Sequence, residues 1–111
     1  VFTIDKVTII NNAENVALSD GIKIRRGATA TITNAFIRLG TGATYADIID
    51  LKDSKGDATD ATSIIGVANT ENGLDIADVK NTTSGGATIN LSAGTTGGAD
   101  TSVFAWTGYS F

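Results

Sequence analysis

The sequence predicts an all-β solenoid, in which short strands stack as about three successive coils, with a β-sandwich as the alternative. Three observations support this prediction. Apolar residues alternate with polar ones in short runs, turn-forming Gly, Asn, Asp and Ser bound those runs, and similar runs recur at a nearly constant spacing. The 111 residues are rich in Ala and Thr and include 13 Gly, and such small side chains suit closely stacked β layers. This length suits a single β domain spanning residues 1–111.

Eight runs carry the strand pattern. Some hold adjacent β-branched residues, as in Thr8-Ile-Ile10, and others alternate strictly, as in Gly21-Ile-Lys-Ile-Arg25. In chain order the expected strands are 6–10, 21–25, 28–33, 35–39, 47–51, 62–67, 87–91 and 102–105. Each is short, as strands of a sandwich, a barrel or a solenoid are.

A weak internal repeat favours the solenoid. Pairs of strand-like runs recur three times, and equivalent residues lie 25 to 29 positions apart. The equivalent pairs are Ile10 and Leu39, Leu39 and Val67, Ile22 and Ile49, and Ile49 and Leu74. A coil of ordinary size gives such spacings, with inward Ile, Val and Leu of one coil stacking on those of the next.

Two segments carry a family resemblance. The run Asp20-Gly-Ile-Lys-Ile-Arg-Arg-Gly-Ala, followed by an apolar strand ending in Asn34-Ala-Phe-Ile37, resembles secreted, cell-surface parallel β-helix proteins of Bacteroidota. Their ends are similar to Ala99-Asp-Thr-Ser-Val-Phe-Ala-Trp-Thr107. The resemblance covers about 30 residues, namely about 20–37 and 99–107. It implies a right-handed parallel β-helix and an extracellular or cell-surface location, and it carries no catalytic residue.

Composition excludes several kinds of chemistry. Without Cys or His the chain cannot build a Cys/His zinc site, a cysteine nucleophile or a Ser-His-Asp triad. Residues 1–55 hold seven Lys/Arg and six Asp/Glu, a balance of +1, whereas residues 56–111 hold one and six, a balance of −5. An acidic half disfavours nucleic acid as a partner. No apolar run reaches the roughly 20 residues of a membrane-spanning helix.

The densest polar cluster runs from Asp50 to Asp60. Its carboxylates, Asp50, Asp53, Asp57 and Asp60, surround Gly56 and suggest a calcium loop, although they do not follow the EF-hand spacing. Two lysines within the cluster partly neutralise it, so a solvated surface loop is the competing interpretation. Calcium is therefore the one cofactor that the sequence suggests.

Basic residues occupy one face of the expected strand 21–25. Lys23 and Arg25 alternate with Ile22 and Ile24, so they should face solvent. We expect cross-strand ion pairs with acids of the neighbouring coils. The candidate acids are Asp47, Asp50 and Asp75. The alternative is an anion or glycan site, and polysaccharide-cleaving β-helices use the same residue types, so a lyase or hydrolase is the enzyme alternative.

Aromatic residues gather near the end of the chain. Phe104 and Trp106 alternate and would share one face of a strand, which predicts a core plug or a capping strand more readily than a sugar-stacking surface. Asn34, between Ile32 and Phe36, is expected in a solvated turn, with an inward-facing corner amide as the alternative.

The first residues suggest how the chain assembles. Val1-Phe-Thr-Ile4 is apolar and strand-like, with neither an initiator Met nor a signal peptide, which we interpret as the start of a processed chain or of a fragment of a longer exported protein. An uncovered β edge recruits another strand, so we expect self-association into an oligomer or filament. The expected function is a non-catalytic structural or adhesive module. The alternative is a carbohydrate-binding or carbohydrate-cleaving β-helix acting on surface glycans.

Overall fold

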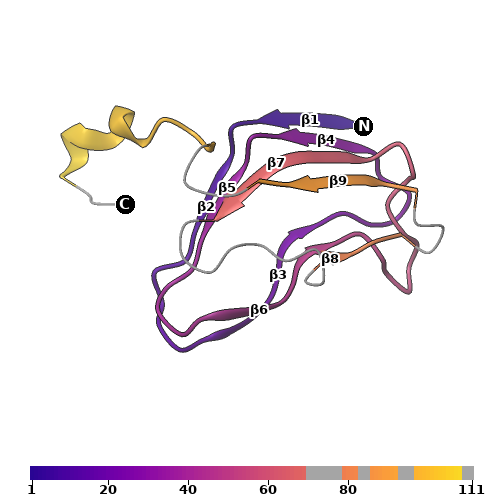
Figure 1. Ribbon diagram of the computed structural model, residues 1–111, viewed down its shortest axis with the longest axis horizontal. Coiled ribbons are helices and arrows are strands. Elements are labelled where there is room, and N and C mark those ends of the chain that lie inside the picture. The colour runs from indigo at the N-terminus through magenta and orange to yellow at the C-terminus, as the bar shows by residue number, and fades with distance from the viewer. Residues whose placement is uncertain (70–78, 83–85, 93–96, 109–111) are drawn as a thin grey trace.

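The computed structural model describes residues 1–69, 79–82, 86–92 and 97–108, and it is an all-β structure with parallel strands in curled sheets (Figure 1). Its strands are β1 (Phe2–Asp5), β2 (Thr8–Ile10), β3 (Ala17–Lys23), β4 (Ala30–Thr33), β5 (Phe36–Arg38), β6 (Thr44–Asp50), β7 (Ser63–Asn69), β8 (Val79–Lys80) and β9 (Thr88–Leu91). A 3-10 helix, η2, spans Thr101–Thr107. Among the described residues, no helix has the length and apolar character needed to cross a membrane.

The strands form two sheets. One has the order β1-β4-β7-β5-β2, with β9 also paired to β7, and the other has the order β3-β6-β8. Every ladder between the described strands is parallel, and each residue pairs with one 24 to 32 positions later. These parallel ladders differ from the antiparallel hairpins of which a β-sandwich is built. The only antiparallel pairing in the described residues is an isolated bridge between Arg25 and Asp57.

The register follows the repeat in part. Ile22 pairs with Ile49, as the sequence predicts. Ile10 pairs with Arg38, one residue short of the expected Leu39, and Ile49 pairs with Val79, so the expected match with Leu74 is wrong. The error has a physical cause: the core fixes which residues face inward, whereas the surface loops set how many residues separate them.

The core consists of columns of aliphatic side chains that run across the strands. In one column Ile4, Ile32, Ile64 and Ile89 occupy the same register position of β1, β4, β7 and β9. Ile32 is 3% exposed and Ile64 is fully buried, whereas Ile4 at the end of the column is 37% exposed. The column of Ile22, Ile49 and Val79 also has its fully buried residue in the middle. Burial thus falls off at Ile4, at the end of the first column, whereas Ile22, at the end of the second column, is still only 8% exposed.

A second column marks the corner between β1 and β2. Lys6, Asn34 and Gly66 follow or interrupt equivalent strands and all have positive φ, of 60°, 54° and 74°. The Lys6 amide donates to the Thr33 carbonyl, and the Asn34 amide donates to that of Ile65, so the parallel ladder continues through the corner. Left-handed geometry turns the chain sharply here, and Asn and Gly tolerate it best. Asn34 is exposed, which confirms the solvated-turn interpretation.

Gly66 gives the first testable prediction. A Cβ at Gly66 would lie 3.2 Å from Asn34 Oδ1 in a backbone with φ +74°. We expect Gly66→Ala to lower the free energy of unfolding by about 2 kcal/mol in urea denaturation. The matched control is Gly27→Ala, because Gly27 has φ +70° with nothing within 4 Å of its Cβ position. That variant should lose only the backbone contribution of about 1 kcal/mol. Equal losses would mean that packing against Asn34 contributes nothing.

The expected strand 102–105 is wrong. These residues lie in η2, where Asp100 caps the N-terminus by accepting a hydrogen bond from the Ser102 amide (3.0 Å). Gly108, with φ 70°, ends the helix, and no described strand lies alongside to pair with this segment. Phe104 and Trp106 are 46% and 84% exposed. They form neither a core plug nor a capping strand.

Candidate functional site

The best-defined polar cluster is a charge ladder across β3, β6 and β8. The register aligns Lys23 with Asp50 and Asp50 with Lys80. Lys23 Nζ lies 2.8 Å and Lys80 Nζ lies 3.6 Å from the same carboxylate oxygen, Asp50 Oδ2. The Asp50 side chain is 1% exposed, whereas the lysine side chains are 34% and 45% exposed. The expected ion pair between Lys23 and Asp50 is thus confirmed, with Lys80 as a third member.

Arg25 pairs with an acidic residue that is not among the expected partners. Arg25 Nη1 binds Asp53 Oδ2 at 3.0 Å, and Lys23 lies 3.8 Å from the same oxygen. Asp47 lies opposite Asp20 in the β3–β6 register. Asp75 lies outside the described residues. As predicted, Lys23 and Arg25 are exposed and Ile22 and Ile24 are buried.

The environment shifts several pKa values. Burial raises the pKa of Asp50, but the hydrogen bond from Lys23, the Lys52 amide and the two lysine charges outweigh it, so the pKa lies below its usual value. The hydrogen bond to Asp50 raises the pKa of Lys23. The Lys55 amide and Arg25 lower the pKa of Asp53. Each shift favours the charged form, as in a structural ion-pair network.

The four aspartates of the suggested calcium loop have separate partners. Asp50 belongs to the charge ladder and Asp53 binds Arg25. Asp57 Oδ1 accepts from the Asp53 amide at 3.0 Å, and Asp60 Oδ1 accepts from the Thr82 hydroxyl at 3.1 Å. These four residues are held within the loop and against neighbouring segments.

The structure instead gathers Asp50 with Asp20 and Asp47, whose nearest carboxylate oxygens lie within 4.8 Å of one another. Three carboxylates can hold a cation, although the Lys23 ammonium already lies 3.4 Å from Asp20 and 2.8 Å from Asp50. Sequence reasoning missed this group. The signal was present in the 27-residue spacing of Asp20 and Asp47, the same as that of Ile22 and Ile49.

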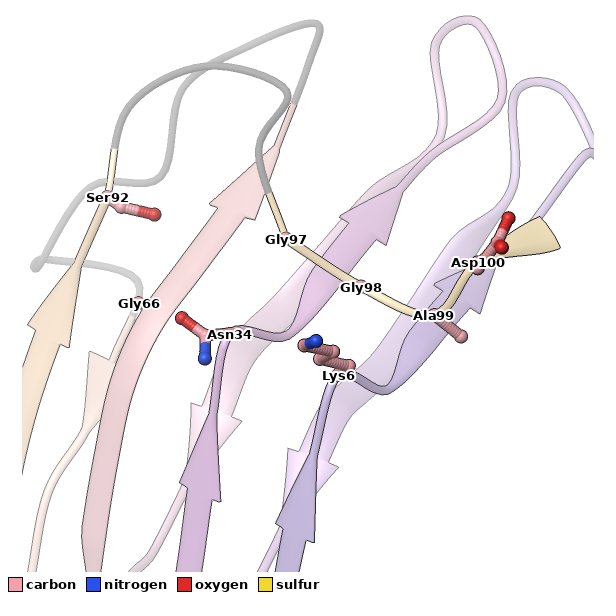
Figure 2. Close-up of a pocket in the computed structure, with 8 residues that line it drawn as sticks. All are labelled: Lys6, Asn34, Gly66, Ser92, Gly97, Gly98, Ala99 and Asp100. Carbon is pink, nitrogen blue, oxygen red and sulfur yellow. The ribbon is translucent and has the colours of Figure 1, made fainter. Parts of the chain in front are cut away.

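A segment near the end of the chain crosses the corner column. Figure 2 shows Gly97 to Asp100 running over the turns that carry Asn34 and Lys6. The Gly98 amide donates to the Asn34 carbonyl (2.6 Å), and the Ala99 amide donates to Thr8 Oγ1 (2.7 Å). A cavity of about 580 Å³ lies along this crossing. Its lining residues are Lys6, Asn34, Gly66, Ser92, Gly97, Gly98, Ala99 and Asp100.

No protein-family model, curated protein or solved structure matches this chain.

An apolar surface lies at the free side of β1 and β2. Among the described strands β1 pairs only with β4, and Val1, Phe2 and Ile4 are 105%, 41% and 37% exposed. A second cavity of about 490 Å³ lies between these strands and the segment leading into η2. Its lining residues are Ile4, Asp5, Lys6, Val7, Thr8, Ile10, Ala99, Thr101 and Phe104.

Proposed function

We propose that this chain is a right-handed parallel β-helix of about three coils, which acts as a non-catalytic structural module and self-associates end to end. The observation that carries the proposal is the open end of the core column that ends at Ile4. Ile4 is 37% exposed although Ile32 and Ile64, at the same register position, are buried. A further β layer against β1 would complete that column.

The coil architecture is supported by the pairing pattern. Three sets of strands recur in the same chain order, with an advance of 27 to 32 residues from one strand to the next: β1-β4-β7, β2-β5-β7 and β3-β6-β8. A coil that returns to the same sheet after each turn produces this pattern. Right-handed crossovers predominate among parallel strands, and the resemblance of residues 20–37 to secreted β-helix proteins supports the same hand.

Backbone polarity at β1 supports strand addition. The Phe2 and Lys6 amides donate toward β4, to the carbonyls of Thr29 and Thr33. Because successive amides of a strand point to opposite sides, the N–H groups of Thr3 and Asp5 point away from β4, toward the free edge. A parallel strand added on that side could accept hydrogen bonds from both of these N–H groups. The last coil of a second copy offers such a strand, which makes the contact heterologous and able to propagate as a filament.

A proline at Thr3 tests this contact. Thr3→Pro removes one free edge donor and leaves the β1–β4 hydrogen bonds intact, because edge positions tolerate proline. We expect association measured by sedimentation velocity to weaken about tenfold or more. Thr3→Ala, which keeps the N–H, is the matched control and should associate like the unchanged chain. Equal association of both variants would show that β1 is not the contact edge.

The extracellular, adhesive role is a further part of the proposal. It is supported by the resemblance of residues 20–37 and 99–107 to secreted β-helix proteins and by the absence of Cys and His chemistry. Deleting the gene for the parent protein should alter surface attachment or biofilm matrix. Unchanged attachment and biofilm in the deletion strain would count against this role.

Glycan binding is the second candidate function. It is favoured by the exposed ring of Trp106 and by the polar side chains of Lys6, Asn34 and Asp100 along the 580 Å³ cavity. Aromatic faces stack on sugar rings, and amide and carboxylate groups bind hydroxyls. A glycan array in the presence and absence of calcium, repeated with Trp106→Ala, tests it. A blank array in both conditions would remove this candidate and, with it, cleavage of such glycans.

A further inference from the structure

The segment Gly97–Asp100 and η2 are together called the arm below, and the arm is tied to the coils at its start. The Ala99 amide donates to Thr8 Oγ1 of the first coil at 2.7 Å. A Cβ at Gly98 would lie only 2.5 Å from Thr8 Oγ1 and 2.6 Å from Phe36 Cβ, so this close crossing requires glycine. The tether therefore fixes the start of the arm beside β2.

One face of η2 is turned toward the first coil. Side chains three residues apart lie on the same face of a 3-10 helix, so Thr101, Phe104 and Thr107 form one row. Thr101 and Phe104 both line the 490 Å³ cavity. The first coil contributes to the same cavity the apolar residues Ile4, Val7 and Ile10. An aromatic side chain of the arm and an aliphatic surface of the coil therefore share one cavity.

The present position of the arm leaves both surfaces partly uncovered. Ile4 is 37% exposed and Phe104 is 46% exposed, and no residue of η2 is buried. Figure 1 shows the helix lying past β2, outside the stacked strands. Movement of the helix onto the first coil would remove apolar surface of both residues from water, which is favourable.

The link between the tether and the helix permits this movement. Asp100 is the single residue between Ala99 and η2, and its backbone is extended, with φ −71° and ψ 101°. Asp100 Oδ1 accepts from the amide (3.0 Å) and the hydroxyl (2.6 Å) of Ser102, which holds the first turn of the helix together. Lids commonly turn about a few residues at the end of an element. The helix can thus turn about Asp100 as one unit.

The helix is long enough to reach the open end of the core. Seven residues of a 3-10 helix span about 14 Å. Thr8, at the tether, and Ile4 lie four residues apart, which is at most about 13 Å of strand. A helix that lies back along the chain from Thr8 therefore ends over Ile4, with Phe104 about midway.

We propose that the arm is a lid that turns about Asp100, seats Phe104 in the 490 Å³ cavity and covers Ile4 at the open end of the core. Solenoids need such covers on their terminal coils, and here a helix of the same chain supplies one. The closed lid also lies over the cavity wall formed by β1, where it competes with a strand added to that edge. This regulatory part rests on the proposed end-to-end association, whereas the lid itself does not.

Disulfide trapping in dilute solution tests the lid, because the chain contains no cysteine. Ile4→Cys combined with Thr107→Cys joins the end of the helix to the open end of the core once their Cα atoms approach within about 7 Å. The matched control is Ile4→Cys with Ala105→Cys, which closes a loop of nearly equal length from another face of η2. We expect intrachain cross-linking of the first pair to be several-fold faster. Equal rates, or no intrachain cross-link, would overturn the lid.

The role of Phe104 is tested in the same cross-linking assay. Phe104→Ala, added to the Ile4→Cys and Thr107→Cys pair, should slow the intrachain cross-link about tenfold, because the closed state loses its buried ring. Trp106→Ala is the matched control, since Trp106 is 84% exposed and lies on another face of η2, and it should leave the rate unchanged. Urea unfolding shows that each variant retains its fold. Equal effects of the two substitutions would show that Phe104 does not close the lid.

Sedimentation of the cross-linked pair separates the lid from the association. The oxidised Ile4→Cys and Thr107→Cys variant should associate about tenfold more weakly than the same variant after reduction. Equal association of the two forms would overturn the regulatory part of the proposal. A monomer in both forms, with the intrachain cross-link formed, would overturn the proposed association and leave the lid standing.

Discussion

Replacing Asp50 by alanine should lower the free energy of unfolding by about 2 kcal/mol, measured by urea denaturation at neutral pH. The side chain is 1% exposed and accepts from Lys23 Nζ and from the Lys52 amide, with Lys80 also 3.6 Å away. Removal leaves the Lys52 amide without this acceptor, takes the 3.6 Å ion pair from Lys80 and leaves Lys23 with its more distant partners Asp20 and Asp53. The loss is smaller than for a fully buried pair because both lysines reach solvent.

The control is Glu14→Ala, because Glu14 is exposed and lies outside the ladder. Its effect should remain within about 0.5 kcal/mol. Asp50→Asn separates charge from shape, since the amide oxygen can still accept from the Lys52 amide while the attraction to both lysines is lost. We expect an intermediate destabilisation. A loss below about 0.5 kcal/mol for Asp50→Ala would show that the ladder does not stabilise the sheet.

The same residue gives a dependence on pH. The pKa of Asp50 is lower in the folded state than in the unfolded chain, where it is about 3.9. Its contribution is therefore present above about pH 4 and is lost as pH falls through the folded pKa. The unchanged chain should lose stability on acidification, and Asp50→Asn should lose less. Some dependence should remain in the variant, because hydrogen bonds also lower the pKa values of Asp5 and Asp100.

Ile64→Ala should be more damaging still, at about 3 to 4 kcal/mol. Ile64 is fully buried, with Ile32 on one side and Ile89 on the other, so truncation leaves a cavity that the parallel strands cannot close. Ile4→Ala removes the same atoms from the open end of that column and should cost less than about 1 kcal/mol in the monomer. Similar losses at Ile4 and Ile64 would contradict the column description of the core.

The strand content could be predicted because alternation and turn residues are local signals. The segments around Ile22, Ile32, Ile37 and Ile89 form strands where the sequence predicts them. The region 102–107 could not be assigned in the same way. Alternation of Phe104 and Trp106 resembles a strand, but the Asp100 cap and Gly108 favour a helical turn, and no described strand lies beside it to supply hydrogen bonds.

The polar contacts, too, could be predicted from the sequence only in part. The pair of Lys23 and Asp50 could be predicted because strand alternation places Lys23 outward and the repeat brings an acid beside it. Lys80 was missed because β8 is only two residues long and carries no pattern of its own. The left-handed Lys6 could not be foreseen, since lysine rarely adopts that geometry. The corner column emerges only when the register aligns Lys6 with Asn34 and Gly66.

The native mass in solution tests end-to-end association most directly. Sedimentation equilibrium of the full chain, over a concentration series at about 0.15 M salt, should give a weight-average mass that rises above the 11.3 kDa monomer, with filaments or closed rings in electron micrographs of the most concentrated samples. A mass that stays at 11.3 kDa to the highest concentration, with no assemblies in the micrographs, would contradict it.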